Sequence, residues 1–365
     1  MPSGRAIRVA GAGPAGLTAA IVLARAGARV EVHEKSDRLC PRFTGELHGI
    51  ENWSSPCDLV DELRTMGIER NFDCAPCRDL AMTNGGEPRA LRRREAVFYM
   101  VSRGSHAGAL EHGLLAQALD AGARVVWRSP LGARDADVVA TGPDPKHRFC
   151  LAIGTRFTTN APDLAAGLIH DRAAPQGYAY LLIRSGVGCL CSVVFDDFGG
   201  ARRHLDAARG ILGRHIPFDV RDAETIGGYG SFRLEPALAT ARALQVGEAA
   251  GLQDFVWGFG IRTAIASGHL AASCWLSGRD YAAEARRVFG PRHRAATVAR
   301  ALWEASATWG FPLYLRWLGA AGGGGDLRAL RFAHRERAIH RLLFPLARGR
   351  MAARYPHLDF VEPGG

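Results

Sequence analysis

The hydrophobic pattern of the first 34 residues predicts a strand, a helix and a second strand. Residues 7–10 and 29–34 are typical of strands, whereas residues 14–26 repeat apolar positions at helical spacing up to Gly27. A glycine-rich turn joins the first strand to the helix, and the second strand ends in Glu34. These segments together predict one short βαβ unit.

After Glu34 the pattern is not the simple series of βα repeats that a nicotinamide dehydrogenase would require. It predicts short helices, strands around a turn at residues 84–86, and a long region rich in β-forming residues that is typical of an antiparallel sheet. The expected helices cover residues 58–70, 108–121, 201–213 and 261–275, and the expected strands lie within residues 78–101, 124–127, 137–140, 150–195 and 244–251.

The turn at residues 11–16 has the spacing of a dinucleotide-binding motif. Gly11 permits the tight turn, Gly13 lets the backbone approach a pyrophosphate, and Gly16 lets the helix pack on the sheet. The helix N-terminus offers N–H groups and a partial positive charge to the phosphates, and Glu34 can accept hydrogen bonds from a ribose. The alternative is a tight turn that binds nothing, which leaves Glu34 unexplained.

A second informative segment lies at residues 244–276. A strand leads into a turn of small residues containing Glu248, followed by a loop with Gly258 and Gly260 and then by a helix rich in small residues. The N-terminus of that helix would direct its dipole at a neighbouring electron-rich ring. The alternative is an ordinary strand–loop–helix connection.

Residues 11–34, 101–123 and 246–272 together resemble the FAD-dependent oxidoreductases of the p-hydroxybenzoate hydroxylase-like superfamily, most closely the geranylgeranyl reductase-like branch. The resemblance implies FAD in an extended pose, with its pyrophosphate at residues 11–16, its ribose at Glu34, its ribityl chain near Glu248 and its isoalloxazine beside residues 258–260. Arg103 matches the arginine that precedes the helix facing the flavin, and residues 42–53 are expected near the ring. The cofactor-binding residues expected in this way are Gly11, Ala12, Gly13, Pro14, Ala15, Gly16, Glu34, Lys35, Arg42, Arg103, Val126, Thr141, Gly142, Gly247, Glu248, Gly258, Phe259, Gly260 and Ile261.

The resemblance also implies the fold class, α/β. A Rossmann-like FAD-binding domain is expected from residues 1–77, 101–150 and 241–280. A mostly antiparallel β-sheet substrate domain, formed by residues 78–100 and 151–240, is inserted into it, and residues 281–365 form a helical C-terminal region.

Several positions depart from the family pattern. Glu248 replaces the usual Asp of the late turn, and residues 141–143 replace the Asp-Gly turn that aromatic hydroxylases use. The Trp-x-Trp-x-Ile-Pro motif of halogenases is absent, and neither Lys35 nor Lys146 lies where a halogenase needs its lysine. The strand at Tyr178 matches the lipid reductases only at the first aromatic position of their tunnel motif.

The function expected from the resemblance is hydride transfer between flavin N5 and an apolar organic substrate, with alkene reduction in an isoprenoid-like molecule as its most specific form. The alternative is a flavin-dependent monooxygenase that hydroxylates or epoxidises through a C4a-hydroperoxide, and a third hypothesis is a flavin-retaining protein without chemistry. No catalytic residue is assigned; His48, Tyr178 and Tyr180 are candidates by location, and packing roles are the alternative. Because a second glycine turn is missing, an external electron donor, NAD(P)H or a ferredoxin, is expected.

Composition and charge refine these expectations. The content of 47% hydrophobic and 22% charged residues is ordinary for a globular enzyme, and an apolar leader or an apolar run approaching 18 residues is missing, so we expect a cytoplasmic protein. The net charge is +10, and the last 85 residues hold 14 Arg and 6 acidic residues. A nucleic-acid partner is not expected, because no binding module accompanies them. A solvated helical face, a peripheral membrane contact and an acidic protein partner stay open.

The eight cysteines include one closely spaced pair, Cys74 and Cys77. The pair is either two thiols in a turn or a redox pair. No metal site is predicted, because a second pair or a His cluster at zinc spacing is missing.

Overall fold

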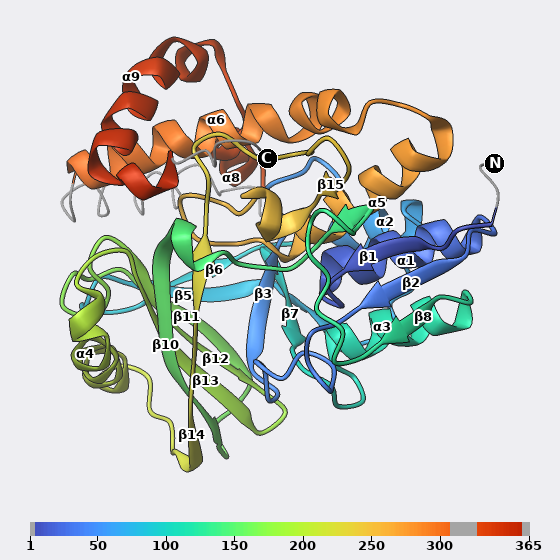
Figure 1. The fold of residues 1–365 in the computed structure, drawn as a ribbon. Coiled ribbons are helices and arrows are strands. Elements are labelled where there is room, and N and C mark those ends of the chain that lie inside the picture. Colours follow the sequence, from blue (N-terminus) through green and yellow to red (C-terminus); the bar gives the residue numbers. More distant parts are fainter. Residues whose placement is uncertain (1–3, 307–326, 360–365) are drawn as a thin grey trace.

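Two large β-sheets of different kinds organise the chain, and a small sheet lies between them (Figure 1). The computed structural model describes residues 4–306 and 327–359. The first large sheet has five parallel strands in the order β15–β9–β1–β2–β8. Its strands are β1 (Ile7–Ala10), β2 (Val30–His33), β8 (Arg124–Val126), β9 (Val138–Val139) and β15 (Leu244–Gln245).

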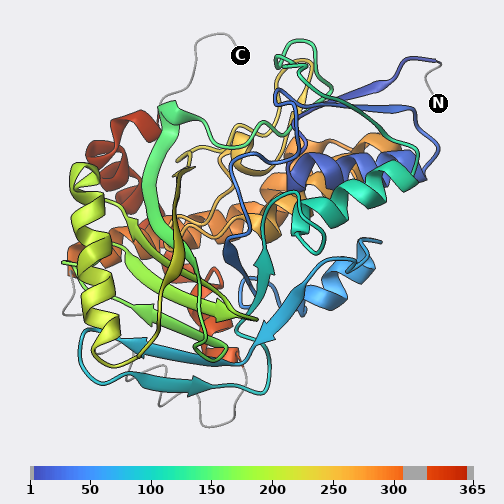
Figure 2. The same cartoon turned by 90° about the horizontal axis from the view of Figure 1, so that it is seen from below.

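Three helices accompany the parallel sheet: α1 (Pro14–Arg25), α3 (Leu110–Asp120) and α5 (Ile261–Ser277). Helix α1 packs against both of the others. Figure 2 shows them side by side. Val9, Val32 and Val138 are fully buried in this part of the core, as expected for strands of a covered parallel sheet. Gly268 allows α5 to approach α1 closely, because a Cβ at this position would lie 2.2 Å from the Ala15 carbonyl oxygen.

The second large sheet has seven strands in the order β14–β10–β13–β12–β11–β5–β6. Neighbouring strands are antiparallel except for β5 and β11, which are parallel. The strands are β5 (Asp79–Thr83), β6 (Arg89–Arg92), β10 (Arg148–Thr158), β11 (Leu164–Leu168), β12 (Tyr178–Arg184), β13 (Val187–Val194) and β14 (Arg221–Ser231).

One face of the seven-stranded sheet is covered by α4 (Ala201–Gly213) (Figure 1). Alternate side chains of β12 point to opposite faces of this sheet. Ala179, Leu181 and Ile183 pack in the cluster that includes the apolar side of α4, whereas Tyr178 and Tyr180 point to the other face. The sheet therefore has one face committed to packing and one available for a site.

The small sheet has the order β3–β7–β4 and is antiparallel. It consists of β3 (Leu47–Glu51), β4 (Cys74–Cys77) and β7 (Phe98–Ser102), and α2 (Leu59–Thr65) follows β3 with Asp58 as its N-cap. The sequence pattern had not marked β3 as a strand, because its apolar and polar positions do not alternate.

Helices dominate the C-terminal part of the chain. Helix α6 (Tyr281–Ser306) runs from the parallel sheet across to the seven-stranded sheet, where α9 (Ala338–Arg354) packs against it (Figure 1). Within residues 4–306 and 327–359, the remaining elements are α8 (Arg328–His334) and short 3-10 helices at Pro145–His147, Phe198–Gly200, Gly247–Ala250 and Pro356–Leu358. None of the helices in the described ranges is long and apolar enough to cross a bilayer.

The predicted fold class is confirmed: a Rossmann-like parallel sheet, a separate and mostly antiparallel sheet, and C-terminal helices. The helix expected at residues 201–213 has the same bounds in the structure. The helix expected at 58–70 is shorter, Leu59–Thr65, and the one expected at 108–121 starts at Leu110.

Candidate functional site

A cavity of about 610 Å³ extends from the parallel sheet to the inner face of the seven-stranded sheet. At one end its wall is formed by residues that follow the carboxyl ends of parallel strands: Gly11 after β1, Glu34 after β2, Thr141 after β9 and Glu248 after β15. This edge of an open parallel sheet is where such folds bind ligands.

The three glycines of the first turn have different physical roles. Gly11 has a φ of +103°, and a Cβ there would lie 2.4 Å from the Ala140 carbonyl oxygen. A Cβ at Gly16 would lie 2.1 Å from the Gly11 oxygen, so this glycine allows the turn to close on α1. A Cβ at Gly13 would meet nothing within 4 Å, because Gly13 borders the cavity. No side chain caps α1, so its first N–H groups remain available to an anion.

Glu34 is held in place by the backbone. Its Oε2 accepts a hydrogen bond from Ala12 N at 3.0 Å, and its Oε1 accepts one from Ser36 N at 3.0 Å. Each carboxylate oxygen retains a lone pair, so Glu34 can still accept hydrogen bonds from hydroxyl groups in the cavity.

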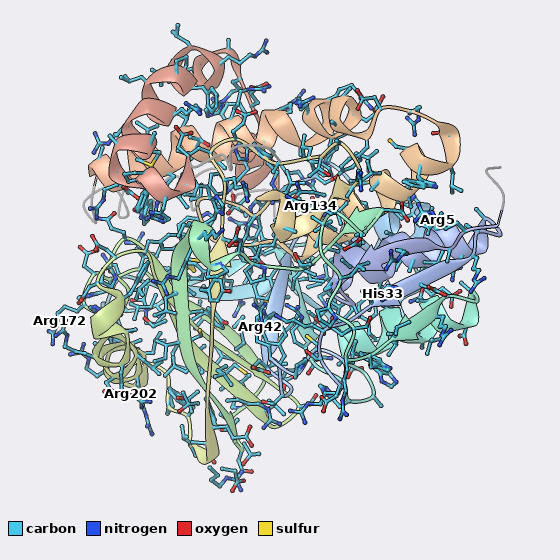
Figure 3. All side chains as sticks on the ribbon, in the orientation of Figure 1. Arg5, His33, Arg42, Arg134, Arg172 and Arg202 are labelled. Atoms are coloured by element: carbon cyan, nitrogen blue, oxygen red, sulfur yellow. The ribbon has the colours of Figure 1, made fainter. Side chains whose placement is uncertain are left out.

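The middle of the cavity wall is basic and aromatic. Arg103 is buried and paired with the fully buried Glu111, whose Oε1 accepts from Arg103 Nε at 2.6 Å. The Arg103 guanidinium also lies over the Phe43 ring at 4.3 Å, and Arg42 lies over the same ring at 4.7 Å. Figure 3 shows Arg42 near the centre of the molecule, between the two large sheets.

Glu248 is half-buried in the cavity wall, where the charges of Arg42 and Arg103 act on it. Burial raises the pKa of its carboxyl group to about 7, although the hydrogen bond from Ser231 N at 2.8 Å and the positive charges of Arg42 and Arg103 lower it. The loop that follows is closed by two backbone hydrogen bonds, from Asp254 N to Phe259 O at 2.8 Å and from Gly258 N to Asp254 O at 3.0 Å. Helix α5 then begins at Ile261, without a side-chain cap at Gly260.

The far end of the cavity is a predominantly apolar chamber. It lies between the inner face of the seven-stranded sheet, the small sheet and α8. Side chains from these elements and the adjoining loops line it, among them Trp53, Met82, Ile169, Tyr180, Trp257 and Leu330.

Most of the expected cofactor residues do line this cavity. Three do not: Gly16 lies behind the turn, Gly247 packs against Ala15, and Val126 ends β8, where its carbonyl oxygen accepts a hydrogen bond from Glu34 N. The expected residues that line the cavity are Gly11, Ala12, Gly13, Pro14, Ala15, Glu34, Lys35, Arg42, Arg103, Thr141, Gly142, Glu248, Gly258, Phe259, Gly260 and Ile261.

Comparisons with known proteins agree with the fold of the chain. Residues 9–57 match the NAD(P)-binding Rossmann-like domain family. A geranylgeranyl bacteriochlorophyll reductase-like protein from Thermoplasma acidophilum superposes with a TM-score of 0.69 at 17% identity, covering 93% of this chain and 98% of the other. The flavin-dependent brominase Bmp2 superposes with a TM-score of 0.61 at 12% identity, covering 95% and 99%. PqsL from Pseudomonas aeruginosa, described as a probable FAD-dependent monooxygenase, gives 0.56 at 15% identity, covering 82% and 96%. No curated protein sequence matches the chain.

The chain has the fold of the FAD-dependent oxidoreductases. Within this flavoprotein fold, the residues present fit FAD on three observations: the open space in front of Gly13, the uncapped N-terminus of α1, and the fixed carboxylate of Glu34. A fourth observation lies at the other end of the site. Gln253 Oε1 is buried without a partner, although its Nε2 donates to Gly258 O at 2.8 Å, and a donor group of a bound cofactor would satisfy it.

The three catalytic candidates all lie in the cavity wall of this flavoprotein fold. Burial and the charges of Arg103 and Arg42 lower the pKa of His48 well below its usual value, so the imidazole is neutral at pH 7. Tyr178 donates to the Trp257 carbonyl oxygen at 2.7 Å, and burial raises the pKa of both Tyr178 and Tyr180.

Sequence reasoning missed His334 in the cavity wall and two charged residues near it, Asp254 and Arg292. A third charged residue near His334, Glu51, was expected close to the flavin ring as part of residues 42–53. Glu51 is buried and accepts a hydrogen bond from Arg292 at 2.7 Å, although the two residues are 241 positions apart. No local pattern marks such a pair. His334 was missed for the same reason, since only folding brings α8 to the cavity.

The Cys74–Cys77 pair is not arranged as a redox pair. Both residues lie in the extended strand β4, where positions i and i+3 are about 10 Å apart and face opposite sides. Cys74 packs with the core of the parallel sheet and Cys77 packs with the small sheet. Burial raises the pKa of each thiol to about 12, and a disulfide between them would require the strand to refold.

Proposed function

We propose that the protein is an FAD-dependent oxidoreductase that transfers hydride between flavin N5 and an apolar organic substrate. The observation that carries the proposal is the continuous cavity, which joins a dinucleotide turn to an apolar chamber. When bound, FAD supplies the hydride chemistry, and the chain supplies binding, orientation and exclusion of water.

The residues proposed to hold FAD follow the order of the cavity wall. Residues 11–16 would bind the pyrophosphate, Glu34 the ribose, Glu248 the ribityl chain, and residues 258–261 the isoalloxazine. The uncapped N-terminus of α5 points its dipole toward this last region, which favours negative charge on the ring. Arg103, held by Glu111, adds a fixed positive charge to the wall.

The chamber supports an apolar substrate, and alkene reduction in an isoprenoid-like molecule is the most specific form of the proposal. Aromatic and aliphatic side chains form most of its surface, so burial of an apolar chain is the main source of affinity. Halogenation is disfavoured, because Lys35 adjoins Glu34 at the dinucleotide end and Lys146 is exposed. The electron donor would be NAD(P)H or a ferredoxin.

The test begins with the cofactor. Purified protein should show a flavin absorbance spectrum and release a compound with the mass of FAD. Gly13→Val should bind FAD at least about tenfold more weakly, because branched bulk would occupy the phosphate space. Gly210→Val is the matched control, since a Cβ there also meets nothing within 4 Å but Gly210 lies on α4 outside the cavity. Equal FAD binding by both variants would contradict the assignment.

The reaction is tested next, on FAD-loaded protein reduced without oxygen. An isoprenoid alkene such as geranylgeraniol should gain two hydrogen atoms while the flavin spectrum returns to the oxidised form. In air, NAD(P)H-dependent oxygen uptake with a product that gains one oxygen atom would instead identify a monooxygenase, which is the activity suggested by the likeness to PqsL.

We also propose a peripheral membrane contact through the C-terminal helices. On α9, Ile339, Leu342 and Leu346 follow helical spacing, and Leu342 and Leu346 are 75% and 76% exposed. Residues 327–359 contain eight Arg and two acidic residues, so the surface around these leucines is basic. An apolar stripe with basic flanks suits an anionic lipid surface.

A further inference from the structure

The apolar chamber contains few polar groups, and most of them already have partners. Tyr178 donates to the Trp257 carbonyl oxygen, and Tyr180 hydrogen-bonds the Cys191 thiol. The described part of the chamber wall therefore offers few free hydrogen-bonding groups to a polar group of a substrate.

His334 differs from these groups. It is the last residue of α8, and its Nδ1 lies 2.9 Å from the Leu330 carbonyl oxygen. A carbonyl oxygen only accepts, so Nδ1 carries the proton and Nε2 of the neutral ring is an acceptor. Within residues 4–306 and 327–359, no group hydrogen-bonds Nε2.

Aromatic contacts place His334 close to the proposed flavin loop. Its ring centroid lies 5.7 Å from that of Trp53, which in turn lies 5.2 Å from Phe259 in an edge-to-face arrangement. His334 lines the chamber, so a ligand group bound at Nε2 would lie there. The Trp53 ring lies between His334 and Phe259, which belongs to the loop that precedes α5.

Burial keeps the His334 ring neutral against the pull of the nearby carboxylates. Burial lowers its pKa, Asp254 and Glu51 raise it, and Arg292 lowers it further. Glu51 is engaged by Arg292, which limits its influence. The net direction is downward from the usual value, so Nε2 is an acceptor at pH 7.

We propose that His334 Nε2 accepts a hydrogen bond from a hydroxyl group of the substrate. The inference rests on the proposed function and narrows its substrate class to apolar molecules that carry one hydrogen-bond donor, such as a long-chain alcohol or an alkylphenol. The apolar body fills the chamber, and the hydroxyl fixes its direction and depth, because a misplaced hydroxyl would be buried without a partner.

The experiment compares two probes that differ in this donor, 1-decanol and 1-methoxydecane. Calorimetric titration of the flavin-loaded protein at pH 7.5 should give about fivefold tighter binding of the alcohol. His334→Phe should bind both probes equally, and His334→Gln, which restores an acceptor, should recover the preference. His112→Phe is the matched control: its Nδ1 also contacts a backbone carbonyl oxygen, at Ser105, but it is exposed and outside the cavity wall.

The possible outcomes distinguish failure of the inference from failure of the proposed function. Retained alcohol preference in His334→Phe, or equal binding of both probes by the unchanged protein, would overturn the inference alone. Failure of both probes to bind would overturn the inference together with the apolar chamber of the proposed function. Loss of flavin from the unchanged protein would contradict the cofactor assignment.

Discussion

At the residue scale, Glu248 shows that a side chain placed for binding can lower the stability of the folded protein. Glu248 is half-buried in the cavity wall, and its pKa of about 7 lies above the 4.5 expected for an exposed Glu. The folded protein therefore holds a proton that the unfolded chain releases between about pH 4.5 and 7. Stability contributed by this group falls as the pH rises through that window.

The corresponding prediction concerns cofactor-free protein. Glu248→Gln should raise the free energy of unfolding at pH 8 by an amount on the order of 3 kcal/mol, and by little at pH 5, where Glu248 is already neutral. The amide oxygen keeps the hydrogen bond from Ser231 N. Urea unfolding at both pH values measures the effect, with the exposed Glu235→Gln as control. The same gain at pH 5 and pH 8 would show that Glu248 is not protonated in the fold.

At the element scale, the contact between α1 and α5 connects the two ends of the cofactor site. Gly268 of α5 lies against the Ala15 backbone, one residue from the Pro14 that begins α1. Gly247, just before Glu248, packs against the Ala15 side chain. The separation of these helices therefore sets the distance between the phosphate turn and the late carboxylate.

Gly268→Ala is expected to separate the helices. The added Cβ would lie 2.2 Å from the Ala15 oxygen, and such overpacking costs about 1–3 kcal/mol of stability. FAD affinity should fall with it. Gly349→Ala in α9 is the matched control, since it meets nothing within 4 Å and should stabilise by about 0.5–1 kcal/mol through helix propensity. Thermal unfolding and FAD titration of both variants test this, and a stabilised Gly268→Ala would refute the close packing.

At the scale of the whole molecule, the seven-stranded sheet and the C-terminal helices enclose the chamber between them. Helix α8 contributes Leu330 and His334 to the chamber, while its Phe332 is exposed on the outside. Arg331 of this helix donates a hydrogen bond of 2.6 Å to the carboxylate of Glu95, which lies in the loop before β7. Helix α8 therefore presents some side chains to the chamber and others to the surface.

The membrane contact predicts binding to anionic vesicles. The protein should cosediment with vesicles of phosphatidylcholine and phosphatidylserine, and binding should weaken as salt is raised. A Leu342→Glu, Leu346→Glu double variant should lose most of this binding. Leu119→Glu, at a leucine of α3 that is also exposed, is the control. Equal binding by all three proteins would show that α9 is only a solvated helical face.

Several parts of the site could be predicted because their residues are close in sequence. The turn at residues 11–16, its helix and Glu34 form one local unit, whose glycines are required by the backbone itself. Glu248 and the loop before α5 were also predicted, from a resemblance of local segments. The sequence also suggests that Trp303, Trp309, Phe311, Tyr314 and Trp317 cap the substrate cavity or rest on lipid. Trp303 packs against Trp257 with ring centroids 5.1 Å apart, and the other four lie outside the described residues.

Amino-acid order alone determined many of the elements and the dinucleotide turn, because strand alternation, helix periodicity and positive-φ glycines act over a few residues. Only the tertiary structure decided what faces the chamber. Arg292 reaches Glu51 across 241 residues, β4 separates Cys74 from Cys77, and α8 brings His334 beside Trp53. Such contacts depend on how the sheets and helices pack, and packing is a property of the whole chain.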